Sequence, residues 1–283
     1  MKSISLTNKS IVIILIVFTF LAYANSLFNS FVWDDYLVIV ENNFIKSWKN
    51  FPLIFTRSYL TSASKIDYLG LNRLDAGEIS YRPLVTASYF MDYSIWKLNP
   101  LGYHFTNIIL HIFNVLLFYL FLSLLIKDRK SSLLASLFFA LHPVNIEAVN
   151  CIAFREDLLA FLFFILSLIL FVRFSSCESR KKIYFYVASL ISYSLALFSK
   201  EMAITLPLVL ILYDYYFVYK NDIKKIIADF KARYLAYIAV SLVYLWVLFF
   251  GMANKLREFP QYPGGSFYVN ILTMSKVIAI YIK

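Results

Sequence analysis

The chain has 283 residues, of which 61% are hydrophobic and only 16% are charged. A soluble domain is usually about 45–50% apolar and about a quarter charged, so this composition excludes a soluble protein and indicates an integral membrane protein. The net charge of +10 does not indicate a nucleic-acid partner, because Lys and Arg are spread along the chain. They form no basic stripe with interleaved aromatic residues, and their expected partners are membrane lipids.

Long apolar runs predict seven membrane-spanning helices and the beginning of an eighth. The seven runs are 11–28, 106–126, 132–148, 158–174, 183–198, 203–219 and 234–251. The eighth begins near Phe267 and reaches Lys283, which is short for a crossing of about 20 residues, so we expect a C-terminal part to be missing. The sequence therefore predicts an all-α integral membrane protein with about seven to eight transmembrane helices, forming a single domain over residues 1–283.

The N-terminal run follows two lysines, as the apolar core of a signal peptide would. The run is long and no cleavage site of small residues follows it, so we expect a retained first helix. Lys and Arg concentrate before this helix and in the segments 127–130, 173–182 and 220–233. The positive-inside rule assigns these segments to the cytoplasm, which predicts a multi-pass protein with a cytoplasmic N-terminus.

A long loop on the extracytoplasmic side, about 29–105, follows the first span and begins with Asp34 and Asp35. Adjacent carboxylates beside a bilayer are costly, because a low dielectric disfavours their charged form, so we expect them to have a chemical role. The stretches 43–55 and 84–98 mix apolar and polar residues, which favours short helices lying in the interface. A loosely structured loop is the alternative.

Four polar residues share one face of the second span, because His104, Asn107, His111 and Asn114 follow one another at helical spacing. A polar stripe on a membrane helix must face protein or water rather than lipid. For His111 and Asn114 we expect hydrogen bonds to other helices. His104 lies near the outer end of the span, where it is a candidate for orienting a ligand.

Charged residues from separate segments meet in the predicted outer turns. The turn between the third and fourth spans places Glu147, Arg155 and Asp157 close together at the membrane surface, with His142 at the end of the third span. Arg155 is either a partner in a structural ion pair or a phosphate ligand, a role that its planar guanidinium suits.

The next outer turn carries Lys200 and Glu201, which are either a solvated pair or part of the same site. Arg82, within the first outer loop, is a third candidate cation. The convergence of carboxylates and cations from separate outer segments indicates a site more strongly than any single segment does.

Several other chemistries are disfavoured by missing motifs. The chain has no GxxxxGK[ST] phosphate loop, no HExxH zinc motif and no GxSxG nucleophile elbow. A divalent metal held by His104, His142 and an aspartate is an alternative that the spacing does not support, and we expect no metal or other cofactor.

Taken in chain order, these motifs resemble those of a known family. They comprise 31–35 (FVWDD), 81–84 (YRPL), 102–104 (GYH) with Asn107 and His111, 142–143 (HP), 147–149 (EAV), Arg155 with 157–159 (DLL), and 199–201 (SKE). The set resembles polytopic glycosyltransferases of the GT-C type. It is most similar to the transmembrane O-mannosyltransferases that carry tetratricopeptide repeats after the membrane region, and to their bacterial relatives. The resemblance covers nearly the whole chain.

This resemblance implies a GT-C bundle and transfer of a mannose-like hexose from a polyprenyl-phosphate donor to a hydroxyl of a protein Ser or Thr, or of a glycan. Transfer would occur on the extracytoplasmic face, with inversion, in a bacterial plasma membrane or a eukaryotic endoplasmic reticulum membrane. A catalytic aspartate in the first outer loop corresponds to Asp35 or Asp34. A multi-span transporter and a membrane anchor for a missing repeat domain are the alternatives.

The other site residues follow from the same scheme. Arg155, Lys200 and Arg82 would bind the donor phosphate and stabilise its charge as the sugar leaves. The residues that would orient the substrates are His104, Glu147, Asp157, Glu201 and His142.

Overall fold

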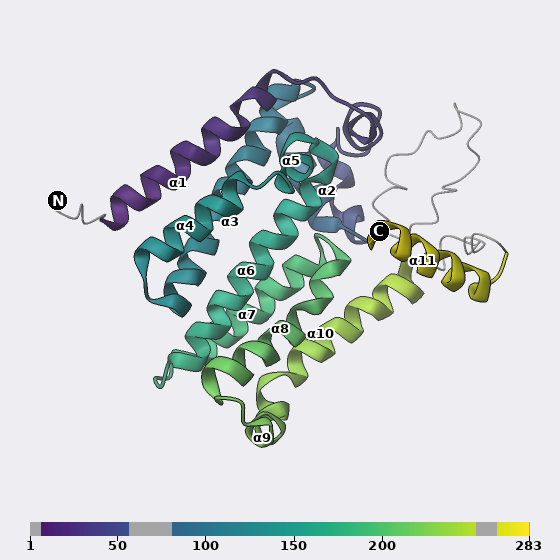
Figure 1. The fold of residues 1–283 in the computed structure, drawn as a ribbon. Coiled ribbons are helices and arrows are strands. Elements are labelled where there is room, and N and C mark those ends of the chain that lie inside the picture. The colour runs from purple at the N-terminus through teal and green to yellow at the C-terminus, as the bar shows by residue number, and fades with distance from the viewer. Residues whose placement is uncertain (1–6, 57–80, 253–264, 283) are drawn as a thin grey trace.

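The computed structural model describes residues 7–56, 81–252 and 265–282. Every regular element within these residues is helical (Figure 1), which confirms the predicted all-α class. The principal helices are α1 (Asn8–Tyr23), α2 (Pro83–Trp96), α3 (Pro100–Ile126), α4 (Arg129–Leu141), α5 (Asn145–Asn150), α6 (Arg155–Ser176), α7 (Lys182–Leu197), α8 (Leu206–Tyr213), α9 (Ile223–Arg233), α10 (Leu235–Trp246) and α11 (Phe267–Ile282). Short 3₁₀ or π-helical segments flank or join them: Ala24–Phe28, Tyr36–Val40, Trp48–Phe55, Ile152–Phe154, Glu201–Thr205, Asp214–Val218 and Val247–Met252.

Four helical segments among the described residues are long and apolar enough to cross a membrane. They are Asn8–Phe28, Pro100–Ile126, Ile152–Ser176 and Glu201–Val218. A fifth candidate is the pair α9 and α10, which is bent by 58°. The remaining apolar helices are shorter than a full crossing, so the expected total of seven to eight spans stays a prediction.

The third predicted span, 132–148, is interrupted. The helix α4 ends at Leu141, and His142 adopts an extended conformation (φ −68°, ψ 131°) before the chain turns into the short helix α5. The cause is Pro143, since the residue before a proline is sterically disfavoured in the helical region. The break turns the chain sideways and places residues 144–150 across the end of the bundle (Figure 1).

The helix α6 lies at the centre of the bundle and packs against α3 and α7, while α3 also packs against α1 and α4. The largest apolar core joins α6 to α7, α8 and α10, with Phe171, Tyr193 and Leu206 among its fully buried residues. A second core fastens the first outer loop to the bundle. There α2 buries Tyr89 and Phe90 against residues 38–54, α3 and the start of α6.

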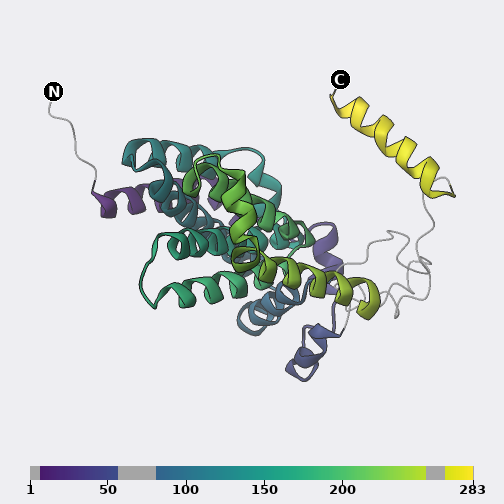
Figure 2. The same ribbon diagram turned by 90° about the horizontal axis from the view of Figure 1, so that it is seen from below.

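The predicted helix over 84–98 is present as α2, which begins with Pro83 at a position where its missing N–H costs nothing, while its place in the interface stays a prediction. Of the predicted helix over 43–55 only the second part is helical, as 3₁₀ turns over Trp48–Phe55. The helix α11 stands away from the rest of the molecule (Figure 2), and the side chains of its residues 267–281 are exposed apart from the half-buried Asn270.

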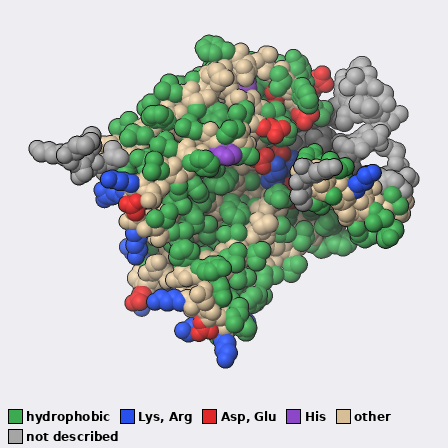
Figure 3. All heavy atoms as spheres, in the orientation of Figure 1, with side chains coloured by type: hydrophobic (Ala, Val, Ile, Leu, Met, Phe, Trp, Pro, Cys, Tyr) green, Lys and Arg blue, Asp and Glu red, His purple; other side chains and the backbone are tan. Residues whose placement is uncertain are grey.

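Charged side chains gather at the two opposite ends of the bundle, with a mainly hydrophobic surface between them (Figure 3). One end, the basic end, is formed by residues 127–131, 177–182 and 219–233. The other end, the site end, carries Asp34, Arg82, Arg155 and Lys200. An apolar belt between two polar ends is what a bilayer-spanning bundle requires.

Candidate functional site

The two adjacent aspartates lie in different environments. Asp34 is exposed, whereas the side chain of Asp35 is fully buried. The residue before them, Trp33, has φ +48°, a left-handed conformation that a bulky side chain rarely adopts. Backbone strain of this kind clusters at functional sites, and here it turns the chain so that Asp35 points inward while Asp34 stays in contact with solvent.

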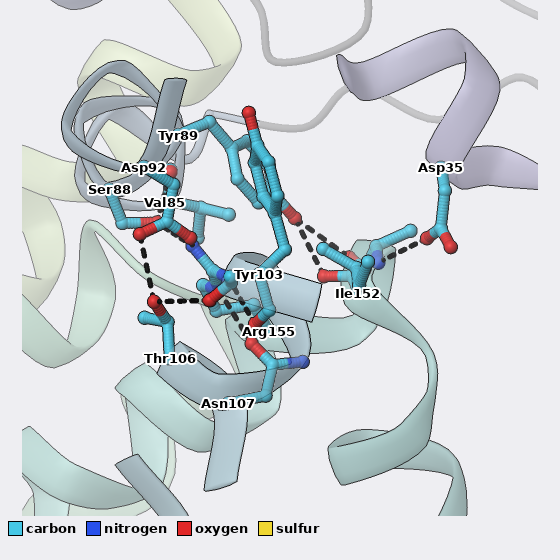
Figure 4. A network of polar contacts seen from close by, with 12 residues as sticks. Asp35, Val85, Ser88, Tyr89, Asp92, Tyr103, Thr106, Asn107, Ile152 and Arg155 are labelled. Carbon is cyan, nitrogen blue, oxygen red and sulfur yellow. Dashed lines mark hydrogen bonds and ion pairs between the residues drawn. The ribbon is translucent and has the colours of Figure 1, made fainter. Parts of the chain in front are cut away.

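Asp35 joins the first outer loop to the start of α6. Its carboxylate accepts the backbone N–H group of Ala153 at 2.7 Å (Figure 4). It also accepts the backbone N–H group of Val32 at 3.0 Å. Burial raises the pKa of the Asp35 carboxyl above its usual range, although both N–H donors oppose this shift. Burial and the nearby Asp35 raise the pKa of the Cys151 thiol to about 11, so this thiol is a protonated donor to Asp35 at 3.8 Å.

Arg155, the first residue of α6, is the most enclosed cation of the site and has no exposed surface. Its guanidinium forms an ion pair with Asp92 of α2 at 2.6 Å and donates to the Asn107 side chain at 2.7 Å. It also donates to the backbone oxygen of Tyr103 at 3.1 Å and lies 5.0 Å from the ring centre of Tyr89.

Figure 4 shows these groups converging from α2, α3 and α6. This geometry corresponds to the structural ion pair that the sequence left open for Arg155. The partner, however, is Asp92 rather than Glu147 or Asp157.

The sequence could have indicated Asp92. Val85, Tyr89 and Asp92 occupy the same face of α2 at spacings of four and three residues, and all three are buried. A carboxylate on the buried face of a helix requires a cation or several donors. Which cation it finds depends on tertiary packing that the local pattern does not contain.

Arg82 forms the second ion-pair group. Its guanidinium contacts Glu156 at 3.0 Å and binds Glu201 through two nitrogens, at 2.9 and 3.3 Å. Arg82 and Glu156 are nearly buried, with 7% and 6% of their side chains exposed, while Glu201 is 32% exposed. Glu156, which the sequence analysis did not select, is therefore an inner member of the site.

Lys200 continues this group toward solvent. Its ammonium lies 2.7 Å from Asp157 and 3.6 Å from Glu156. Lys200 is 22% exposed and Asp157 is 44% exposed, so their contact is the most accessible ion pair of the site. The predicted convergence of Arg82, Asp157, Lys200 and Glu201 is thus present in the structure. Arg155, which directly precedes Glu156 in α6, belongs to the separate group around Asp92.

A cavity of about 460 Å³ opens beside this group. Asp157, Lys200 and Glu147 contribute its charged lining, and Glu147 is exposed on α5. Most of the remaining lining is apolar and comes from α4, α5, α6 and the turn after Lys200: Phe139, Val144, Ala148, Leu158, Ala160, Phe161, Phe164, Met202 and Ala203. A charged mouth above an apolar wall suits a ligand with a polar head and a hydrocarbon chain.

Neither of the two predicted histidines joins these ion pairs. His104 is fully buried on α3, one residue after Tyr103. His142 follows the end of α4, where its Nδ1 accepts the backbone N–H of Val144 at 3.2 Å. Among the described residues, no three His, Cys, Asp or Glu side chains are arranged to hold a metal ion.

The polar stripe of α3 binds to neighbouring helices, as predicted for two of its members. The Asn114 amide donates to the backbone oxygen of Leu158 in α6, and His111 Nε2 lies 3.2 Å from the backbone oxygen of Ala140 in α4. The Asn107 amide also donates to the backbone oxygen of Val149 in α5 and to that of Cys151 in the turn before α6. This stripe fixes α6 and therefore the position of its first residues.

Comparison with known proteins gives a consistent set of relatives. The chain is 30% identical over 228 residues to the protein O-mannosyl-transferase TMTC2 of Homo sapiens, a match that covers 79% of this chain and 26% of the relative. It is 32% identical over 206 residues to TMTC1 of Homo sapiens, covering 69% of this chain and 22% of the relative. The chain thus spans about a quarter of the length of these curated relatives. No solved structure matches the chain.

A family model matches residues 81–257, which is more than half of the chain and includes every ion pair described at the site end. The model describes dolichyl-phosphate-mannose-protein mannosyltransferases. This chain is therefore a member of the dolichyl-phosphate-mannose-protein mannosyltransferase family.

Proposed function

We propose that this chain transfers a mannose-like hexose from a polyprenyl-phosphate donor to a hydroxyl group of a protein acceptor, at the extracytoplasmic face of its membrane and with inversion. The observation that carries this proposal is the Lys200–Asp157 ion pair in the lining of a mostly apolar cavity. Glu156 contacts both Lys200 and Arg82, and so joins this pair to the Arg82–Glu201 contact. The family supports the sugar and the acceptor class, because the relatives are named protein O-mannosyl-transferases.

In this scheme the donor phosphate lies at the bilayer surface, because its polyprenyl chain remains in the hydrocarbon region. In this proposal Lys200, which lines the cavity, and Arg82 bind the phosphate, which replaces Asp157 or Glu201 as their partner. The apolar wall formed by Phe139, Phe161 and Phe164 receives the first part of the chain.

Asp34 is the proposed general base, because it is exposed while Asp35 is buried and accepts two backbone N–H groups. The Asp34 carboxylate takes the proton from the acceptor hydroxyl as the hydroxyl oxygen attacks the anomeric carbon of the sugar. The bond from this carbon to the phosphate oxygen breaks, and the polyprenyl phosphate leaves with the negative charge. Lys200 and Arg82 stabilise that charge as it develops. Asp35 acts as a positioning residue by holding the loop against the start of α6.

The test is transfer from radiolabelled mannosyl polyprenyl phosphate to a Ser/Thr peptide by the purified protein in nanodiscs. We expect Asp34→Asn to lower kcat by about 10²–10⁴-fold, the usual contribution of general base catalysis, with little change in the donor KM. The matched control is Glu178→Gln, the same carboxyl-to-amide change at an exposed residue of the opposite end. Transfer by Asp34→Asn at the control rate would remove Asp34 from this role. Absence of transfer by the unmodified protein with every hexose donor would contradict the proposed reaction itself.

A further inference from the structure

The helix α9 lies at the basic end, opposite the proposed transfer site, and no step of that reaction uses it. It follows the π-helical turn Asp214–Val218 and is bent by 58° from α10. In Figure 1 α9 is viewed nearly end-on, whereas α6 and α10 run across the view. The axis of α9 is thus steeply inclined to the bundle helices at the end of the apolar belt.

A buried ion pair holds α9 in this orientation. Arg233, its last residue, binds both carboxylate oxygens of Asp214 at 2.7 Å. Tyr234 donates to the same carboxylate, and Arg233 also donates to the Ser175 hydroxyl of α6. Asp214 has no exposed surface, so this contact ties the end of α9 to the bundle interior rather than to solvent.

One face of α9 is apolar and mostly uncovered. Ile226 is 3% exposed and packs into the bundle, but Ile223 is 54%, Ile227 68% and Phe230 37% exposed. At 100° per residue these four side chains fall within about 100° of the helix circumference, which is the width of an amphipathic stripe. The described residues of the chain bury only Ile226 among these four side chains.

Lysines border this stripe on one side. Lys224 and Lys231 are exposed, seven residues apart, and lie within about 60° of Ile227 on the helix circumference. Lys225 is on the opposite face, where it pairs with Asp222 at 3.5 Å. The other segments of the basic end add Lys127, Arg129, Lys130, Arg180, Lys181 and Lys182 to the same end of the bundle. A ligand that matches this surface must offer apolar groups to the stripe and negative charges to the lysines beside it.

We infer that α9 is an interfacial helix that binds the surface of an anionic bilayer. Ile223, Ile227 and Phe230 enter the boundary between headgroups and acyl chains, and Lys224 and Lys231 contact the headgroup phosphates. The Arg233–Asp214 pair sets the angle at which the helix lies on the membrane. A protein partner would cover the same stripe without requiring anionic lipid.

The experiment is hydrogen–deuterium exchange of the backbone amides of residues 223–233. The full chain is placed in nanodiscs of phosphatidylcholine alone or of an equimolar mixture with phosphatidylglycerol. We expect exchange in the anionic nanodiscs to be slower by about fivefold for each lysine that contacts the surface. Raising the salt concentration should reduce the difference, because screening weakens the attraction.

Two single substitutions provide matched controls, since Lys231→Gln and Lys225→Gln remove the same charge from the same helix. We expect Lys231→Gln to reduce the lipid dependence of exchange about fivefold and Lys225→Gln to leave it unchanged. Ile227→Gln should speed exchange in both kinds of nanodisc. Equal exchange of the unmodified protein in both bilayers, or equal effects of the two lysine variants, would overturn the proposal. Neither result bears on transferase activity, which depends on the other end of the molecule.

Discussion

The role assigned to Arg155 can be tested through Asp92. Replacing Asp92 with Asn removes the charge that balances a guanidinium with no exposed surface. Breaking a buried ion pair by removing one partner costs about 3–5 kcal/mol, because it leaves an uncompensated charge. Asn107 and the Tyr103 backbone oxygen still accept two of the guanidinium hydrogen bonds. We therefore expect a loss at the lower end of this range, about 3 kcal/mol.

The assay is equilibrium unfolding of the purified protein in detergent, followed by tryptophan fluorescence. The control is Asp157→Asn, the same chemical change in the partly exposed Asp157–Lys200 pair, for which we expect about 0–1 kcal/mol. A double replacement of Asp92 by Leu and Arg155 by Met should be more stable than Arg155→Met alone, because it leaves no buried charge unpaired. If Asp92→Asn costs no more than Asp157→Asn, Arg155 is not held by this ion pair and the interpretation is wrong.

Three further predictions concern other contacts. A Cβ on Gly102 would lie 2.1 Å from the Trp96 ring, so Gly102→Ala should destabilise the protein by about 1–3 kcal/mol in the same assay, and this loss should disappear in a Trp96→Ala background. Because the pKa of Asp35 is raised in the folded protein, the folded state holds the carboxyl proton more tightly than the unfolded chain does. The stability that this proton contributes is complete below the ordinary carboxyl pKa of about 3.9 and is lost as the pH rises through the raised pKa. The stability of the unmodified protein relative to Asp35→Asn should therefore decrease over that interval, and an increase would contradict the shift. Glu201→Gln removes one anion from Arg82 and should lower the donor KM in the transfer assay, whereas a higher KM would show that Glu201 assists donor binding.

The sequence predicted features that depend on local pattern. Four of the predicted apolar runs, 11–28, 106–126, 158–174 and 203–219, coincide with helices long and apolar enough to cross a membrane. Such runs can be read from the sequence because each is continuous and its length is set by the bilayer. The α3 stripe was predicted to turn inward because polar groups are excluded from lipid, and His111 and Asn114 do so. The two charged outer turns were predicted to meet because every second turn of a multi-span chain lies on the same side of the membrane. The Lys200–Asp157 contact agrees with this.

Features that depend on tertiary contacts could not be predicted in the same way. The motif around Asp34 and Asp35 gave no means of distinguishing the two residues, since the difference arises from the backbone N–H of Ala153, 118 positions away from Asp35. The hydrophobic pattern predicts a continuous span over 132–148, but Pro143 disfavours the helical conformation of His142 and the helix ends at Leu141. The ion pairs of Asp92 and Glu156 cannot be predicted from the local pattern, because their partners come from distant segments of the chain.

Arg155, Arg82 and Lys200, which the sequence treats as equivalent candidates, are each paired with an anion, and these pairs differ in exposure. An unpaired charge beside a bilayer is costly, so before a phosphate arrives each cation needs an anion. Side-chain exposure rises from 0% in Arg155 to 7% in Arg82 and 22% in Lys200, and their most exposed partners follow the same order, from Asp92 to Glu201 to Asp157. An exposed carboxylate can be released into water at little cost, whereas a buried one cannot. Lys200 should therefore exchange its partner for a phosphate first and Arg82 second, while Arg155 keeps Asp92 and holds α2, α3 and α6 in place.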